Sequence, residues 1–142
     1  MGVKVSTKWL GDIRFESTNP SGHNLFIDAG EENGGKGEGY RPKALMLSGL
    51  AGCSGIDVAG LIKKMKLDVA DFSIKIDANL TEEHPKFYDK VTMAFHFYGD
   101  NLNEKKLQRA VDLSVEKYCG VMEMFRQFAE VSVETYFHNK SA

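Results

Sequence analysis

The stretch that decides the fold is PKALMLSGLAGCSGIDVAGLIKKMK, residues 42–66, the longest apolar run of the chain. A proline is favoured at the first position of a helix, where its missing N–H group would have had no partner. The run is apolar on nearly every side, which is typical of a helix surrounded by protein. We therefore expect a helix from Pro42 to about Met65 at the centre of the fold. A transmembrane span would place the Asp57 carboxylate in lipid, so a core helix is the better interpretation.

Glycines recur at positions 49, 52 and 55 of this predicted helix, on either side of Cys53. Each glycine in a helix interior costs about 1 kcal/mol relative to alanine. Steps of three residues keep the glycines near one face, which becomes thin enough for another backbone to approach. The glycines indicate that Cys53 lies where two elements meet closely. The plainer alternative is that they serve helix packing alone.

The remaining sequence predicts an α+β fold. Asn101 and Glu104 resemble a capping box at the start of an amphipathic helix that reaches Cys119. Alternation of polar and apolar residues predicts a hairpin over 3–15 and further strands over 23–29, 72–78, 91–97 and 131–135. A second, shorter helix is expected over 121–128. Strands, helix, strands, helices and a final strand follow one another, an order typical of the α+β class.

Size and composition indicate a single soluble domain. A chain of 142 residues, 42% hydrophobic and 27% charged, lies in the ordinary range for one globular domain. The net charge of -2 argues against a general nucleic-acid footprint. The opening residues, MGVKVSTKWLG, lack the apolar segment of a signal peptide. We expect one domain over residues 1–142, located in the cytoplasm, with neither nucleic acid nor membrane as a partner.

Cys53 and Cys119 are the two cysteines of the chain. A chain of this size without a leader does not need a disulfide for stability, so one interpretation is two reduced core thiols. Cys119 lies in SVEKYCGV, residues 114–121, where it ends a helix beside an aromatic residue and a glycine. Since both cysteines have glycine neighbours at a helix, the second interpretation is a reactive pair. The four histidines show no spacing typical of a zinc site, and we expect no metal and no cofactor.

A reactive cysteine needs a positive charge nearby. A thiol with a pKa near 8.5 is only about 3% thiolate at pH 7, whereas a pKa of about 6 gives roughly 90%. The candidate cations are Arg14, Arg41 and Lys43. Asp57 opposes them, because it lies four residues after Cys53 on the same helical face, where a carboxylate raises a thiol pKa. We expect a cation to pair with Asp57; the alternative is a less reactive Cys53.

Several segments together resemble the OsmC/Ohr family, and in particular its branch of small OsmC-like proteins. They are the opening KWLGDIRFESTNPSGH (8–23), the glycine-rich helix (42–66), EEHPKFYDKV (82–91) and AVDLSVEKYCGV (110–121). The resemblance implies an intertwined homodimer in which two central helices lie between six-stranded antiparallel sheets built from both subunits. It thus places the thin glycine face at a dimer interface.

The resemblance also implies an activity, the reduction of organic hydroperoxides in oxidative stress defence. Cys53 matches the peroxidatic position and Cys119 the resolving position, and the implied reductant is a small dithiol such as dihydrolipoamide. Family members with this activity have a glutamate directly after the proline that opens the central helix, where it positions a catalytic arginine. The chain has Lys43 there, so the arginine role passes to Arg14 as first candidate and Arg41 as second.

Two differences from the active family members support an alternative function of another class. Lys43 in place of the glutamate, together with Asp57 near the thiol, is compatible with a non-catalytic OsmC-like module. Such a module would keep the apolar cleft of the dimer and bind a small hydrophobic or thiol-reactive ligand there.

Overall fold

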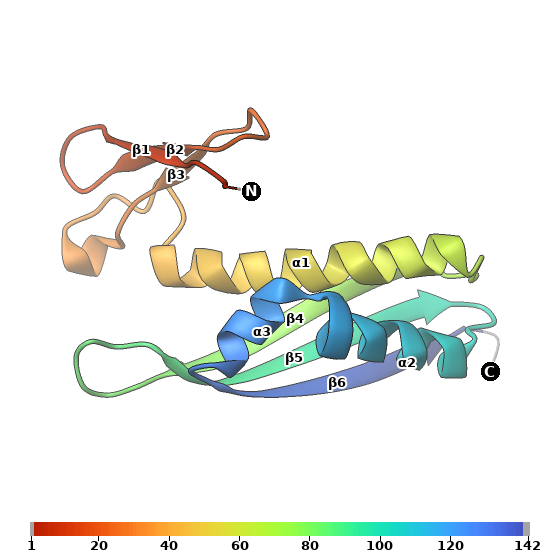
Figure 1. The fold of residues 1–142 in the computed structure, drawn as a ribbon. Coiled ribbons are helices and arrows are strands. Elements are labelled where there is room, and N and C mark those ends of the chain that lie inside the picture. The colour runs from red at the N-terminus through yellow and green to blue at the C-terminus, as the bar shows by residue number, and fades with distance from the viewer. Residues whose placement is uncertain (1, 141–142) are drawn as a thin grey trace. The chain divides into compact units, whose positions relative to one another are not determined.

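The computed structural model describes residues 2–140 and divides the chain into two compact units, Met1–Met46 and Leu47–Ala142. The elements of each unit are drawn in Figure 1. Three-stranded sheets occur in both units, and the helices belong mainly to the second. The predicted α+β class is therefore confirmed.

The N-terminal unit is a small antiparallel sheet. Its strands are β1 (Ser6–Trp9), β2 (Phe15–Thr18) and β3 (Leu25–Ile27), paired in the order β1-β2-β3. The turn between β1 and β2 contains Gly11 and Asp12, both with positive φ, which glycine and aspartate accept more readily than most residues. The predicted hairpin and third strand are confirmed. A short 3-10 helix, η1 (Glu31–Asn33), lies in the loop that follows.

The long predicted helix is present as α1, Pro42–Lys64, and its residues from Leu47 onward belong to the C-terminal unit. The other elements of that unit are β4 (Asp71–Leu80), β5 (Tyr88–Gly99), α2 (Glu104–Leu113), the π-helix η2 (Ser114–Tyr118), α3 (Gly120–Arg126) and β6 (Glu130–Asn139). Each predicted element thus has a counterpart within a few residues of its expected bounds.

The sheet of the C-terminal unit is mixed, with the order β4-β5-β6. β4 and β5 are antiparallel, but β5 and β6 run parallel over the whole length from the pair Lys90 and Glu130 to the pair Gly99 and Asn139. Parallel neighbours need a crossover of a dozen or more residues, which the helical segment from α2 to α3 supplies. The expectation of antiparallel sheets therefore holds for every strand pair of the two units except this one.

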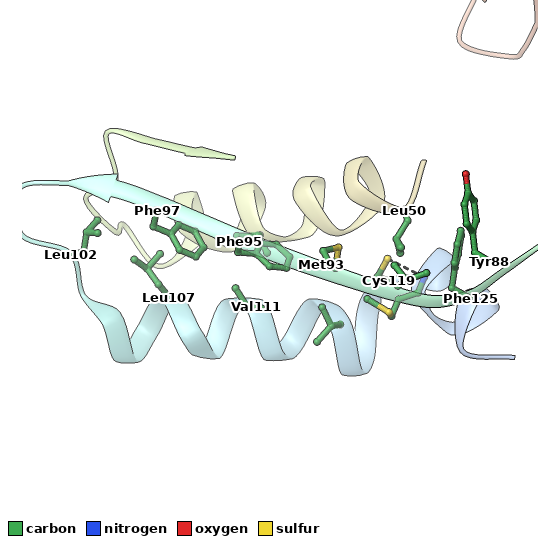
Figure 2. Close-up of a cluster of buried hydrophobic side chains, with 14 residues drawn as sticks. Leu50, Tyr88, Met93, Phe95, Phe97, Leu102, Leu107, Val111, Cys119 and Phe125 are labelled. Atoms are coloured by element: carbon green, nitrogen blue, oxygen red, sulfur yellow. Dashed lines mark hydrogen bonds between the residues drawn. The ribbon is translucent and has the colours of Figure 1, made fainter. Parts of the chain in front are cut away.

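The core of this unit lies between the sheet and its helices. Alternate residues of β5 are buried, and Figure 2 shows Phe95 and Phe97 pointing towards Leu107 and Val111 of α2. Large buried aromatic side chains contribute most of the apolar area that stabilises such a core. The side chain that caps α2 is Asn103, which accepts a hydrogen bond from the Lys106 N–H.

The expected cap, Asn101, was wrong by two residues. The chain first buries Leu102, whose N–H donates to the Asn139 side chain, and only then enters the helix. The amide of Leu102 is thereby satisfied from β6, and the helix begins at Glu104.

α1 has two different faces. Its buried residues, Leu50, Ser54 and Val58, are spaced by four and form the stripe that packs in the core. The other side of the helix is largely exposed although it is apolar, and Ile56 is 75% exposed. Within the described residues, α1 is the one helix long and apolar enough to cross a bilayer, but its buried stripe and Asp57 identify it as a core helix of the unit. Within residues 47–140, the buried residues of this core helix thus lie on one face.

Candidate active site

The structure brings the two cysteines together inside the C-terminal unit. Cys53 lies in the middle of α1 and is partly exposed, whereas Cys119 is only 4% exposed and joins η2 to α3. Both are free thiols, and Cys53 lies close enough to Cys119 to affect its ionisation. The sequence prediction of a neighbouring pair is therefore supported by their placement.

Cys119 is positioned by an unusual backbone segment. The Cys119 N–H donates to the Ser114 carbonyl oxygen at 2.8 Å, which closes the five-residue turn of the π-helix. Cys119 then leaves the helical conformation and caps α3, since its Sγ accepts the N–H of Met122 at 3.3 Å. Short π-helical segments are rare and occur frequently at functional sites. This turn holds the sulfur at the junction of two helical segments.

Two buried serines connect α1 with this turn. Ser54 Oγ donates to Cys119 Sγ at 3.1 Å. Ser114 Oγ lies 3.3 Å from the Ser54 carbonyl oxygen and 3.1 Å from Asp57 Oδ2, and can donate to either. Both serine side chains are fully buried, where an unpaired hydroxyl would be unfavourable. These hydrogen bonds therefore set the register between the helix that carries Cys53 and the turn that carries Cys119.

The surroundings of Cys119 change its acidity in opposing directions. Burial raises the pKa of the Cys119 thiol, because the charged thiolate loses solvation. The Ser54 hydroxyl and the Met122 N–H oppose this rise, and the nearby Cys53 thiol adds to it. The net direction is upward from a value of 9.0, so Cys119 is a neutral thiol at pH 7.

Asp57 has a different partner from the one expected. Its carboxylate accepts the hydroxyl hydrogen bond from Ser114, and no cationic side chain of the C-terminal unit forms a salt bridge with it. The candidate cations Arg14, Arg41 and Lys43 belong to the N-terminal unit, so the pairing of Asp57 with a cation stays a prediction. A partly buried carboxylate needs hydrogen-bond donors in place of water, and the Ser114 hydroxyl is a neutral donor of this kind.

Arg14 and Arg41 belong to the N-terminal unit. The Arg14 guanidinium lies over the Phe26 ring at 5.0 Å, and its Nε is 3.8 Å from Glu38 Oε2. This Nε atom is buried, and among residues 2–140 no acceptor lies within hydrogen-bond distance of it. Arg41 is exposed, and among residues 2–140 its side chain donates to the Gly39 carbonyl oxygen alone. Arg14 is therefore the arginine that the fold holds in a defined environment.

The loop that carries Glu38 is anchored by Asp28, which is 2% exposed. The Asp28 carboxylate accepts the backbone N–H groups of Ala29, Lys36 and Glu38 at 2.8, 3.2 and 3.1 Å. These hydrogen bonds, that of Glu38 first, lower the Asp28 pKa against the effect of burial. Glu38 is thus held beside Arg14 by a folded loop.

Sequence reasoning missed three residues of these arrangements, namely Ser54, Ser114 and Glu38. The two serines carried a signal, because each is a polar residue in an apolar stripe next to a cysteine segment. Glu38 carried none, since it lies in a glycine-rich loop with other acidic residues. Among residues 2–140, no group of three or more His, Cys, Asp or Glu side chains is placed to hold a metal ion.

Comparison with known proteins identifies relatives of the whole chain. The protein YhfA of Escherichia coli K12 is 32% identical over 130 residues, which is 92% of this chain and 94% of that protein. A crystal structure of a hypothetical protein from Aquifex aeolicus VF5 superposes with a TM-score of 0.84 at 28% identity, covering 96% of each chain.

A structure with lower sequence identity to this chain is named for its role. The organic hydroperoxide resistance protein OsmC of Legionella pneumophila superposes with a TM-score of 0.71 at 18% identity, covering 96% of this chain and 97% of that one. At this identity the likeness establishes the fold. The family model described as OsmC-like protein matches residues 35–134. Together with the relative from Escherichia coli, this match shows that the chain belongs to the OsmC-like protein family.

Proposed function

We propose that this protein is a thiol-dependent peroxidase that reduces organic hydroperoxides in the cytoplasm as part of oxidative stress defence. The observation that carries the proposal is the pairing of a partly exposed cysteine, Cys53, with a buried one, Cys119, in a chain of the OsmC-like family. An exposed sulfur can meet a substrate, and a buried neighbour can form a disulfide with it.

The first step oxidises Cys53. Its thiolate attacks the terminal oxygen of the hydroperoxide, the O–O bond breaks, and the alkoxide leaves and takes a proton to become an alcohol. Cys53 is left as a sulfenic acid. A cation lowers the barrier by stabilising both the thiolate and the developing alkoxide.

The second step forms a disulfide. The Cys119 sulfur attacks the Cys53 sulfenic acid, the S–O bond breaks, and the departing hydroxide combines with the proton that Cys119 loses to give water. A dithiol such as dihydrolipoamide then reduces the disulfide by thiol exchange and is itself oxidised. Both thiols return to the reduced form present in the structure.

Arg14 is the cation that we assign to this reaction, with Arg41 as the second candidate. The position after the helix-opening proline holds Lys43, so the glutamate found there in active family members is missing. Glu38 lies 3.8 Å from Arg14 and supplies a carboxylate from another loop. A paired, partly buried guanidinium is a better defined charge than the exposed Arg41.

The active form is a homodimer in this proposal. The exposed apolar side of α1 supports it, because Ile56 is 75% exposed and a partner helix would cover it. A Cβ atom added at Gly49 or Gly52 would meet nothing within 4 Å in the described chain, while one at Gly55 would lie 3.2 Å from Ile74. Only Gly55 is therefore explained by packing inside the chain.

The family match also bears on domain organisation. It runs from residue 35 to residue 134 and so begins in the first compact unit and ends in the second. It supports the proposal that residues 1–142 form one OsmC-like domain.

One observation favours a second function, a module that binds a small hydrophobic or thiol-reactive ligand without turning it over. Asp57 lies one helical turn from Cys53, and no cationic side chain of its unit forms a salt bridge with it. An unneutralised carboxylate disfavours a thiolate nearby.

The test is consumption of cumene hydroperoxide and of hydrogen peroxide by the purified protein with dihydrolipoamide as reductant. The peroxidase proposal expects rapid turnover of the organic peroxide, slower turnover of hydrogen peroxide, and loss of both in Cys53→Ser. Ser132→Ala, which changes an exposed serine of β6, is the matched control and should be as active as the wild type. Rates equal to those of a free small thiol would contradict the proposal and favour the binding module.

A further inference from the structure

We propose that Ser54 is a positioning residue for disulfide formation, in which its hydroxyl holds and activates the Cys119 sulfur. This inference rests on the proposed peroxidase function and assigns a role to a residue that touches neither the hydroperoxide nor Cys53's reacting oxygen. It concerns the second step of the reaction alone.

The geometry gives the Ser54 hydroxyl one clear acceptor. Ser54 is fully buried, and its Oγ donates to Cys119 Sγ at 3.1 Å. A neutral thiol is a weak hydrogen-bond acceptor, whereas a thiolate is a charged and therefore strong one. The hydrogen bond is consequently stronger after Cys119 loses its proton than before. Only an interaction that strengthens in this way accelerates a step in which the thiolate is the nucleophile.

A second donor points at the same sulfur. The Met122 N–H reaches Cys119 Sγ at 3.3 Å, so two donors meet a sulfur that is almost wholly buried. Burial alone would make ionisation of Cys119 costly, and these donors are the described groups that oppose the cost. The backbone N–H cannot be removed by a side-chain change, which leaves Ser54 as the group that mutation can test.

Ser114 keeps the donor in place. Its hydroxyl can donate to the Ser54 carbonyl oxygen or to Asp57, both on α1, so α1 cannot slide along the turn that carries Cys119 without losing this bond. Among residues 2–140, Asp57 forms a hydrogen bond with Ser114 and none with either sulfur. The donors to the Cys119 sulfur are the neutral Ser54 hydroxyl and Met122 N–H.

Disulfide formation, the step in which Ser54 takes part, needs only the two cysteines of the protein. Cys53–SOH and Cys119–SH become Cys53–S–S–Cys119 and water; the S–O bond breaks, the S–S bond forms, and the Cys119 proton leaves with the hydroxide. The oxidising equivalent comes from the organic hydroperoxide of the first step. No further oxidant or reductant takes part.

The experiment is a single turnover of the wild type, Ser54→Ala and Ser54→Thr, each with one equivalent of cumene hydroperoxide. Sulfenic acid at Cys53 is trapped with dimedone, and the disulfide is measured by mass spectrometry across a range of pH. In Ser54→Ala, we expect unchanged sulfenic acid formation and disulfide formation slowed by about tenfold, the effect of losing one hydrogen bond of about 1.4 kcal/mol. The pH profile of this second step should move to higher pH, and Ser54→Thr should restore it.

Three outcomes would overturn the inference. Disulfide formation at the wild-type rate in Ser54→Ala would show that the hydroxyl is not needed. A slower rate with an unshifted pH profile would show that Ser54 has a packing role only. Absence of sulfenic acid at Cys53 in the wild type would overturn the peroxidase proposal, and this inference with it. Ser132→Ala, at an exposed serine of β6, is the control.

Discussion

Cys53 and Cys119 are the same residue type a short distance apart, but their surroundings are opposite. Cys119 is 4% exposed and accepts hydrogen bonds from Ser54 and Met122. Cys53 is partly exposed and lies on a helix whose outer face is apolar and uncovered in the single chain. These different environments support the proposed roles, in which Cys53 reacts with the hydroperoxide and Cys119 reacts with the oxidised Cys53.

The largest effect should come from removing one or the other sulfur. In Cys53→Ser, we expect consumption of organic hydroperoxide to fall by about 10³-fold or more, since the nucleophile itself is lost. In Cys119→Ser, the first step should survive, and a sulfenic acid should accumulate at Cys53 and be trapped by dimedone. Equal losses of the first step in the two variants would remove the distinction between the cysteines.

The second prediction tests exposure directly. Under reducing conditions, iodoacetamide should modify Cys53 in the native protein about 100-fold faster than Cys119, because a buried thiol reacts only after local opening of the structure. Peptide mass spectrometry gives both rates in one sample. In urea the two rates should become similar. A native Cys119 that reacts as fast as Cys53 would contradict its burial.

The third prediction concerns the cation assigned to Cys53. Arg14→Met should slow the oxidation of Cys53 by hydroperoxide by about 10- to 100-fold, since a hydrogen bond to a charged group contributes about 1.5–3 kcal/mol. Arg41→Met is the matched control and should change the rate little. Single-turnover dimedone trapping separates this step from disulfide formation. A larger loss in Arg41→Met than in Arg14→Met would transfer the role to Arg41.

The smallest effect is on stability at high pH. Because burial raises the Cys119 pKa in the folded state, the unfolded chain loses this proton first as pH rises. The stabilisation is complete below about pH 9, the ordinary thiol value, and is lost as pH rises from there through the folded pKa. Urea unfolding of the reduced protein at several pH values should show a flatter alkaline loss of stability for Cys119→Ala than for the wild type. Parallel curves for the two proteins would contradict the raised pKa.

The fold could be predicted largely from the sequence because its signals are local. The apolar run after Pro42 predicted α1, and period-two alternation predicted β4, β5 and β6. Alternation is the same for parallel and antiparallel neighbours, so it could not indicate that β5 and β6 run parallel. That result depends on the crossover through α2 and α3, a tertiary arrangement.

The two cysteines of the candidate site could be predicted from the sequence, but the groups that position them could not. Cys53 and Cys119 stood out by their glycine neighbours, and the structure places them close together. The π-helix before Cys119 has no sequence signal, since its residues fit an ordinary helix equally well. The hydrogen bond from Ser114 to Asp57 could not be predicted, because a hydroxyl from a distant element cannot be inferred from helical spacing.

A mass measurement decides whether Cys53 and Cys119 form one redox pair. One equivalent of cumene hydroperoxide is added to the reduced protein, which is then alkylated and digested without reductant. We expect a single linked peptide pair containing Cys53 and Cys119, lighter than the two free peptides by two hydrogens. Two separately alkylated peptides, or a Cys53 that links only to another chain, would contradict it.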